Sequence, residues 1–270
     1  KNSGLGNGAN EVSRSTVRFD PDGTIEVRHC WTEMGQGIHT VTRQVAVEEL
    51  GVDPDRIKVV VDTTRELGAG QTTGSRGTVM GAGSVADACR NATAGGCEEG
   101  VEYEGVYVVD WTNSINDGLE NPVIHSTFGY AAQLVELDPE TGEIAKVVAA
   151  HDVGRAVNPL LCEGQIEGAV HMGLGYALTE GFPCDEHGKP VNETLRSLDI
   201  IRPKDMPPTE VILVESPDPN SPYGIKGVGE IGLVPTAGAV AAALHAHDGE
   251  WRHELPMRTE RNRERARAWS

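Results

Sequence analysis

The segment YGIKGVGEIGLVPTAGAVAAAL, residues 223–244, holds the residues best suited to chemistry. Gly227, Gly229 and Gly232 match G-x-G-x-x-G, a pattern in which backbone N–H groups hold the pyrophosphate of a dinucleotide. Glu230 lies between the second and third glycines, where its carboxylate would set like charge beside a pyrophosphate. Either the glycines or the carboxylate can carry the function, and the surrounding elements must decide.

A dinucleotide-binding turn needs a strand before the glycines, a helix after them and an acidic residue about 20 positions further on. A helix fits from Pro235 to a stop at Gly249, and Asp248 could supply the acid. The preceding residues 215–226, ESPDPNSPYGIK, contain Pro, Asp, Asn and Ser, which favour turns over strands. We therefore keep a nicotinamide- or flavin-binding module only as the alternative function.

The chain has 270 residues, enough for one large domain or two of ordinary size, and its net charge is −18. Phosphates would be repelled over most of this surface, which argues against nucleic acid or an anionic membrane as a partner. The sequence contains no run of about 18 apolar residues, the length that would span a membrane. Its first residues, KNSGLGNGANE, lack the apolar stretch of a signal peptide. We expect a cytoplasmic protein, and the Gly-rich start without Met suggests a fragment of a longer subunit.

The five cysteines are odd in number and never fall in C-x-x-C spacing. This pattern predicts a reducing compartment and argues against a zinc or iron–sulfur site held by this chain. We expect the cysteines to be buried free thiols. The histidines form no ligand-spaced pair beyond His245 and His247, which would point to different faces of a helix, so we predict no metal ligands.

The first half of the chain joins a hairpin pattern to helical patterns. Residues 16–30 alternate apolar and polar positions around Asp-Pro-Asp-Gly, which predicts a β-hairpin. Residues 38–51 show a helical pattern that stops at Gly51, and residues 55–62 predict a buried strand. A polar glycine-rich loop then leads into a helix of small residues.

The second half repeats this plan, with a hairpin pattern over residues 129–153 and an apolar helical pattern over residues 158–182. Each glycine inside a helix costs up to about 1 kcal/mol relative to alanine. Either another group approaches this helix closely, or the helix packs tightly on a sheet. The glycines concerned are Gly164, Gly168, Gly173 and Gly175.

These elements predict an α+β fold of two related α/β subdomains built of β-hairpins and helices. We expect the first subdomain at residues 1–115 and the second, with the Glu230 loop, at residues 116–257. Residues 111–126 are the candidate linker between them. The charged residues 258–270 form a C-terminal tail.

Three loops combine glycine with side chains that form hydrogen bonds: residues 35–37, residues 71–78 and the Glu230 loop. Glycines let N–H groups converge on an anion, and Gln, Thr and Ser add neutral donors. The sequence GSRGT, residues 74–78, lies just before a predicted helix, where a phosphate finds free N–H groups and a favourable dipole. Together the loops suit a large polar cofactor that bears phosphate.

Four stretches resemble, in order, the molybdopterin-binding domain of the xanthine dehydrogenase and aldehyde oxidase family of molybdenum hydroxylases. They are TEMGQGIHTVTRQVAVEELGV, QTTGSRGTVMGAGSV, DVGRAVNPLLCEGQIEGAVHMGLGYALTEG and KGVGEIGLVPTAGAVAAAL, and the likeness covers roughly residues 1–257. The resemblance implies a C-terminal portion of the large subunit with a molybdenum–pyranopterin cofactor, often molybdopterin cytosine dinucleotide. Glu230 then falls at the family's active-site glutamate, and the G-x-G-x-x-G match is a coincidence.

Carried over by position, the resemblance also implies the residues that contact the cofactor. They are Gln36 and Gly37, the loop Gly74, Ser75, Arg76, Gly77 and Thr78, and a further wall at Gln165 and Gly168. Met172 departs from the pattern, because several family members have Gln there. Its side chain cannot supply the amide hydrogen bond to the cofactor.

The resemblance implies oxidative hydroxylation of an electron-poor C–H carbon in a purine- or xanthine-like heterocycle or an aldehyde, with oxygen from water. Glu230 would be the general base, strengthened by burial among Gly229, Ile231 and Leu233. Electrons would pass to [2Fe–2S] and FAD on partner domains or subunits, and the N-terminal half of the molybdenum subunit would complete the pocket of an oligomeric enzyme. A non-catalytic structural domain is the remaining alternative.

Overall fold

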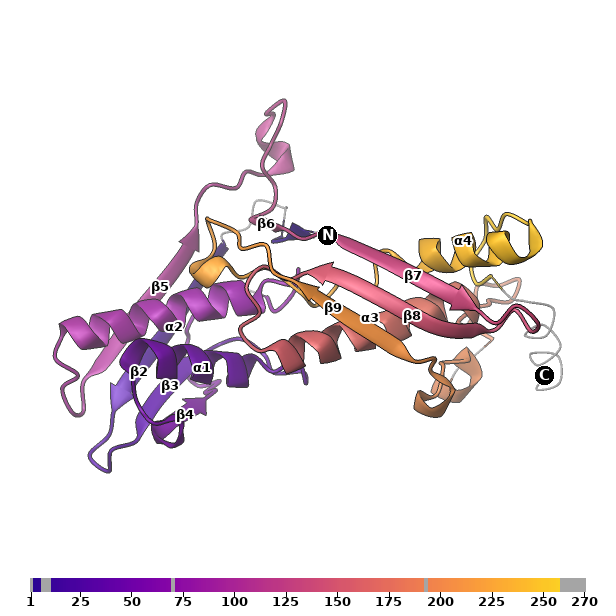
Figure 1. Ribbon diagram of the computed structural model, residues 1–270. Coiled ribbons are helices and arrows are strands. Elements are labelled where there is room, and N and C mark those ends of the chain that lie inside the picture. The colour runs from indigo at the N-terminus through magenta and orange to yellow at the C-terminus, as the bar shows by residue number, and fades with distance from the viewer. Residues whose placement is uncertain (1, 6–10, 69–70, 192–193, 258–270) are drawn as a thin grey trace. The chain divides into compact units, whose positions relative to one another are not determined.

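The structure is a computed structural model that describes residues 2–5, 11–68, 71–191 and 194–257 (Figure 1). The chain divides into two compact units, each assembled from several segments. The first comprises residues 1–129, 152–162 and 214–229, and the second residues 130–151, 163–213 and 230–270. The subdomain limits expected from the sequence stay a prediction, and the charged tail at residues 258–270 lies outside the described residues.

The first unit contains a four-stranded sheet in the order β4-β3-β2-β5 (Figure 1). Strands β2 (Glu11–Phe19) and β3 (Ile25–His29) form the predicted antiparallel hairpin. Helix α1 (Ile38–Leu50), which ends at the predicted Gly51, leads from β3 to β4 (Ile57–Val60), and β4 runs parallel to β3. The expectation of a buried strand here is wrong, because β4 is an edge strand in which only Ile57 is buried.

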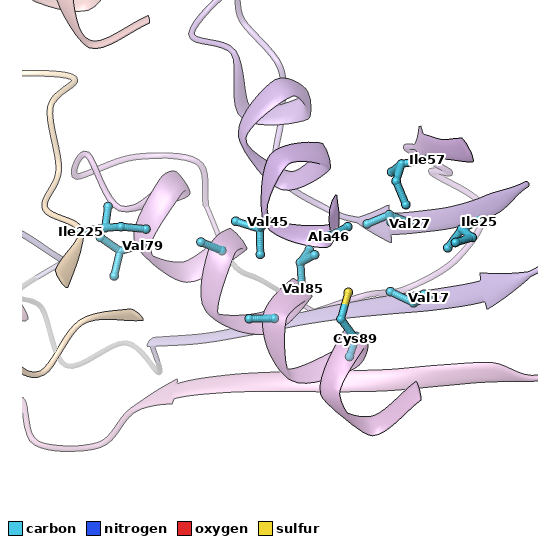
Figure 2. Packing of buried hydrophobic residues seen from close by; sticks show 13 residues of the cluster. Val17, Ile25, Val27, Val45, Ala46, Ile57, Val79, Val85, Cys89 and Ile225 are labelled. Atoms are coloured by element: carbon cyan, nitrogen blue, oxygen red, sulfur yellow. The ribbon is translucent and has the colours of Figure 1, made fainter. Parts of the chain in front are cut away.

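Helix α2 (Gly77–Ala94) packs closely on β2 and β5 (Glu102–Val109) because small residues line the contact. A Cβ added to Gly105 would lie 2.1 Å from the backbone nitrogen of Ala88 and 2.3 Å from the carbonyl oxygen of Ser84. The hydroxyl of Ser84 also lies 2.9 Å from that of Ser13 and 2.7 Å from that of Ser15 on β2. Valine, isoleucine and alanine side chains, together with Cys89, fill the core of this unit (Figure 2).

The second unit contains a three-stranded sheet in the order β7-β8-β9. Strands β7 (Ala131–Leu137) and β8 (Ile144–Asp152) form the second predicted hairpin. Helix α3 (Pro159–Leu178) lies between β8 and β9 (Thr209–Val214) in the sequence, and helix α4 (Thr236–Asp248) contacts β7. A short pair, β1 (Asn2–Ser3) and β6 (Thr127–Phe128), belongs to the first unit.

The order of elements in the second half repeats that of the first, as the sequence predicted. In each half a hairpin is followed by a helix, a third strand beside the second hairpin strand, a glycine-rich loop and another helix. The GSRGT loop precedes α2, and the Glu230 loop precedes α4. These two loops therefore hold corresponding places in an α+β fold, and the predicted fold class is confirmed. Within the described residues, no helix is long and apolar enough to cross a membrane.

The close contact between α2 and β5 predicts a strong effect of one added methyl group. Gly105→Ala places a Cβ against backbone atoms that cannot yield, so we expect the free energy of unfolding to fall by about 2 kcal/mol or more. Gly238→Ala is the matched control, because an added Cβ in α4 meets no atom within 4 Å. It should leave stability unchanged or raise it by up to about 1 kcal/mol in urea unfolding. Equal effects of the two changes would contradict the packing.

Candidate functional site

Glu230 begins a tight turn just before α4. The N–H of Leu233 donates to the carbonyl oxygen of Glu230 at 3.2 Å, which closes the turn. The burial expected for Glu230 is wrong, because its side chain is exposed in this chain while the neighbouring Ile231 is fully buried. Successive side chains of a tight turn point in different directions, so a buried neighbour does not bury the next residue.

Two glycines before Glu230 pack against Ser75 in the first unit. A Cβ on Gly227 would lie 2.1 Å from the Ser3 hydroxyl and 2.2 Å from the Ser75 carbonyl oxygen, and one on Gly229 would lie 3.4 Å from the Ser75 hydroxyl. Ser75 has φ 53° and Gly74 has φ 65°, so both adopt the left-handed conformation. The structure therefore brings the predicted GSRGT loop together with the glycines that precede Glu230.

A buried ion pair anchors the same segment, and sequence reasoning missed it. The ammonium of Lys226 lies 2.7 Å from a carboxylate oxygen of Asp152, and both side chains are buried. The N–H of Lys226 also donates to the carbonyl oxygen of Val153 at 3.2 Å. No local spacing reveals a pair separated by 74 positions. Removing either Lys226 or Asp152 would leave the other as an unpaired buried charge, which is strongly unfavourable. The ion pair therefore holds the segment in place.

Gly232, two residues after Glu230, packs against α3 in the second unit. A Cβ on Gly232 would lie 2.6 Å from the Cβ of Ala169 and 3.0 Å from the carbonyl oxygen of Ile166. The turn that begins at Glu230 therefore rests on the part of α3 that carries Gln165 and Gly168. Gln165 is half-buried and Gly168 is exposed.

The four glycines of α3 lie in different surroundings. An added Cβ at Gly173 would lie 2.6 Å from the Cβ of Thr236, and one at Gly175 would lie 2.1 Å from the flexible carboxylate of Glu180. At Gly164 and Gly168 an added Cβ meets no atom within 4 Å. Tight packing against α4 explains Gly173, and the helix face at Gly164 and Gly168 is open to another group.

Helix α2 begins at the GSRGT loop with an N-terminus that its own side chains leave open. Its N-cap residue Arg76 makes no side-chain cap hydrogen bond, and the first turn has no acidic residue. Gly77 and Thr78, the first helical residues, are half-buried. Free N–H groups and the helix dipole favour an anion at this position.

The Arg76 side chain is buried and forms contacts that hold this loop in place. Its guanidinium donates to the carbonyl oxygen of Gln71 at 2.6 Å, lies 5.3 Å above the ring of Trp31 and is 3.9 Å from the carboxylate of Glu11. Burial lowers the pKa of Arg76 from its usual value, and Glu11 opposes this shift. Because the Arg76 side chain is engaged inside the protein, only the backbone of this residue could contact a cofactor.

At the N-terminus of α1 the arrangement is the opposite, because Glu33 occupies the anion position. Its carboxylate accepts from the N–H groups of Gly35 and Gly37 at 2.9 Å each and from that of His39 at 3.2 Å. The Gln36 amide donates to the carbonyl oxygen of Thr32 at 2.7 Å. An amide has two hydrogens, so Gln36 can still bind a ligand, but Glu33 already binds the N–H groups of Gly35 and Gly37 beside it.

The side chains of the described residues form no group of three or more His, Cys, Asp or Glu placed to hold a metal ion. None of the five cysteines, all of which lie in the described residues, forms a disulfide, but only Cys89 is buried, and burial raises the pKa of its thiol to about 12. The expectation of uniformly buried thiols is therefore wrong. Cys184, for example, lies in an exposed loop.

Comparison with known proteins identifies the family of this chain. The model of the molybdopterin cofactor-binding domain matches residues 1–99 and 92–207. The chain belongs to the molybdopterin cofactor-binding domain family. The predicted resemblance is thereby confirmed, while the roles of the individual site residues stay predictions.

Relatives of this molybdopterin cofactor-binding domain are much longer proteins. It is 29% identical over 297 residues to the 6-hydroxypseudooxynicotine dehydrogenase complex subunit gamma of Paenarthrobacter nicotinovorans, covering 94% of this chain and 36% of the relative. It is 28% identical over 286 residues to an aldehyde oxidoreductase molybdenum-binding subunit of Escherichia coli O157:H7, covering 94% and 38%. The solved aldehyde oxidoreductase of Desulfovibrio gigas superimposes with a TM-score of 0.84 at 26% identity, covering 98% and 31%. The chain thus spans about a third of the length of these proteins.

The Glu33 cap predicts a stability difference that depends on pH. Desolvation opposes ionisation of Glu33, but its backbone donors outweigh it and hold the pKa below the ordinary value of 4.5. A lowered folded-state pKa contributes stability above the unfolded value and loses it as pH falls through the folded value. Glu33→Gln should therefore lower the free energy of unfolding by about 1 kcal/mol at pH 7, with a smaller difference below pH about 4.

Glu48→Gln is the control for this experiment, because it removes the same charge from an exposed position on α1. Urea unfolding of both variants from pH 3.5 to pH 7 gives the comparison. A Glu33→Gln effect no larger than that of Glu48→Gln would show that the carboxylate does not cap α1.

Proposed function

We propose that this chain is the cofactor-binding part of a molybdenum hydroxylase that oxidises an electron-poor C–H carbon, with oxygen from water. The observation that carries the proposal is the exposed side chain of Glu230, on a turn that packs closely against α3 at Gly232. The relatives are named for aldehydes and for 6-hydroxypseudooxynicotine, which supports an aldehyde or a nitrogen heterocycle such as a purine as the substrate.

The described residues fit a cofactor that bears phosphate. The open N-terminus of α2 offers the backbone N–H groups of Gly77 and Thr78 to a phosphate group, and the left-handed Gly74 and Ser75 shape the loop before it. This fit supports molybdopterin in its cytosine dinucleotide form, whose pyrophosphate would occupy the position. When bound, the molybdenum centre supplies the two-electron oxidation.

Other predicted residues of this chain would bind the rest of the pterin. Gln36 retains an amide hydrogen for its polar ring atoms, and Gly37 has φ 84°, a left-handed conformation that favours glycine. On α3, the open backbone at Gly168 admits a flat group, and the half-buried Gln165 can donate to its edge. These residues would bind and orient the pterin, and they would take no part in the chemical step.

Glu230 would take part in the chemical step itself. Hydroxylation with oxygen from water releases a proton, and a carboxylate on a fixed backbone is suited to accept it. Exposure of the side chain gives a substrate access to it. Binding of cofactor and substrate would then remove the surrounding water and strengthen the electrostatic interactions of the carboxylate.

The two electrons would leave through other parts of the enzyme. We propose [2Fe–2S] and FAD modules on partner domains or subunits, together with the rest of the molybdenum subunit, in an oligomeric cytoplasmic assembly. The printed names support such an assembly, since one relative is a complex subunit and another a molybdenum-binding subunit. Free cysteines support a reducing compartment.

A dinucleotide-binding module finds less support. Strand β9 ends at Val214, and the short helix Pro222–Gly224 lies between it and Gly227. The glycines therefore do not follow a strand directly, and close contact with Ser3 and Ser75 accounts for Gly227. It stays the alternative function, beside a non-catalytic structural domain.

The base assignment predicts the effect of Glu230→Gln in the assembled enzyme. The amide keeps the shape but cannot accept the proton, so turnover should fall by at least about 100-fold while molybdenum content is unchanged. Glu140→Gln, in the exposed turn between β7 and β8, is the control and should turn over normally. Near-normal turnover of Glu230→Gln would end the assignment.

The cofactor proposal predicts what denaturation releases from the natively purified protein. A pterin with molybdenum, accompanied by iron and flavin from the partner modules, is the expected result. Fluorescence of the oxidised pterin, metal analysis and flavin absorbance measure the components separately. Nicotinamide would instead support the dinucleotide-binding module, a complete lack of cofactor would support the structural domain, and molybdenum without iron would contradict the proposed electron route.

A further inference from the structure

Gln133 on β7 holds the turn that begins at Glu230. Its side-chain nitrogen Nε2 lies 2.7 Å from the carbonyl oxygen of Gly232 and 3.3 Å from the ring nitrogen Nε2 of His151. The amide nitrogen has two hydrogens, and these two acceptors match them. Rotating the amide by half a turn would place its oxygen against the Gly232 oxygen, so the neighbours determine its orientation.

His151 on β8 supports this orientation of the Gln133 amide. Because the Gly232 oxygen places the amide nitrogen of Gln133, His151 Nε2 must be the acceptor, and this assigns the ring proton of the neutral imidazole to Nδ1. The ring is fully buried, and Nδ1 has no hydrogen-bond partner within the described part of the chain. Burial lowers the pKa of His151 to about 4, so the ring is neutral at physiological pH. It therefore stays an acceptor where a protonated ring would repel the amide.

The Gly232 carbonyl lies two residues after Glu230 within the closed turn. Gln133 holds this carbonyl, the hydroxyl of Thr236 donates to it at 3.0 Å, and α3 blocks movement of Gly232 toward Ile166. Thr236 bonds as an ordinary first-turn residue of α4, whereas Gln133 reaches the turn from 99 positions away. Gln133 thus provides a tertiary contact that joins the turn to strand β7.

We propose that Gln133, oriented by the buried His151, is a positioning residue that fixes the Glu230 carboxylate for its role as base. The inference rests on the proposed function, because it presumes that Glu230 takes a proton in the reaction. A base displaced by about 1 Å can cost up to about 100-fold in rate even when binding is retained. The effect of losing Gln133 should therefore fall on kcat and not on KM.

The direct test is Gln133→Leu in the assembled enzyme, with Gln44→Leu as the matched control. Gln44 lies on α1 in the first unit, and its side-chain oxygen accepts a hydrogen bond from the Asn158 amide. We expect kcat of Gln133→Leu to fall about 10-fold or more per bound molybdenum, with KM unchanged, while Gln44→Leu keeps its kcat. A normal kcat in Gln133→Leu with full molybdenum content would overturn the inference.

A double-variant comparison separates this inference from the base assignment. If Gln133 acts through Glu230, adding Gln133→Leu to Glu230→Gln should cost almost nothing further. Full additivity would mean that Gln133 acts by another route and would overturn the positioning role. Normal turnover of Glu230→Gln would instead remove the proposed function, whatever Gln133→Leu does.

Variants of His151 provide a second route if Gln133→Leu does not assemble. His151→Phe removes the acceptor and frees the amide to rotate, so kcat should fall about 3- to 10-fold. His151→Gln can restore an acceptor near the position of Nε2, and kcat should recover. Nitrogen-15 NMR of the wild-type ring should show the Nδ1–H tautomer. The Nε2–H tautomer, or equal kcat in both variants, would contradict the role of His151.

Discussion

Close approach between backbones is the constraint on which the site depends. Around Glu230 the chain runs against Ser75 at Gly227 and against α3 at Gly232, and in each place a Cβ would meet another residue closer than atoms can approach. Glycine is needed there for lack of a side chain, not for a left-handed conformation, since neither residue has a positive φ. Close packing therefore explains Gly227 and Gly232, two of the three glycines in the pattern that resembles a nucleotide-binding turn.

The repeated order of elements gives this constraint a context. Each half places a glycine-rich loop between its third strand and its last helix, and the two loops have diverged in what they offer. The loop before α2 presents an open helix N-terminus suited to an anion, and the loop before α4 presents an exposed carboxylate. The chemistry we propose needs both, one to hold a phosphate-bearing cofactor and the other to accept a proton.

Local patterns in the sequence predicted most of the regular elements. Both hairpins, the stop of α1 at Gly51 and the start of α4 after Pro235 depend on neighbouring residues, and the structure confirms them. The contacts that position the site are not local. The bond from Gln133 to Gly232 joins residues 99 positions apart, and no periodicity marks a glutamine for a partner so distant. Exposure of Glu230 likewise depends on the geometry of one turn.

The most direct measurement is the location of molybdenum and phosphorus in crystals of the assembled enzyme. Anomalous scattering at the molybdenum edge locates the metal, and the density of the cofactor locates its phosphates. We predict that the metal lies beside the Glu230 carboxylate and that a phosphate accepts hydrogen bonds from the first N–H groups of α2. Metal far from Glu230, or phosphate at the N-terminus of α1 in place of the Glu33 carboxylate, would contradict the account.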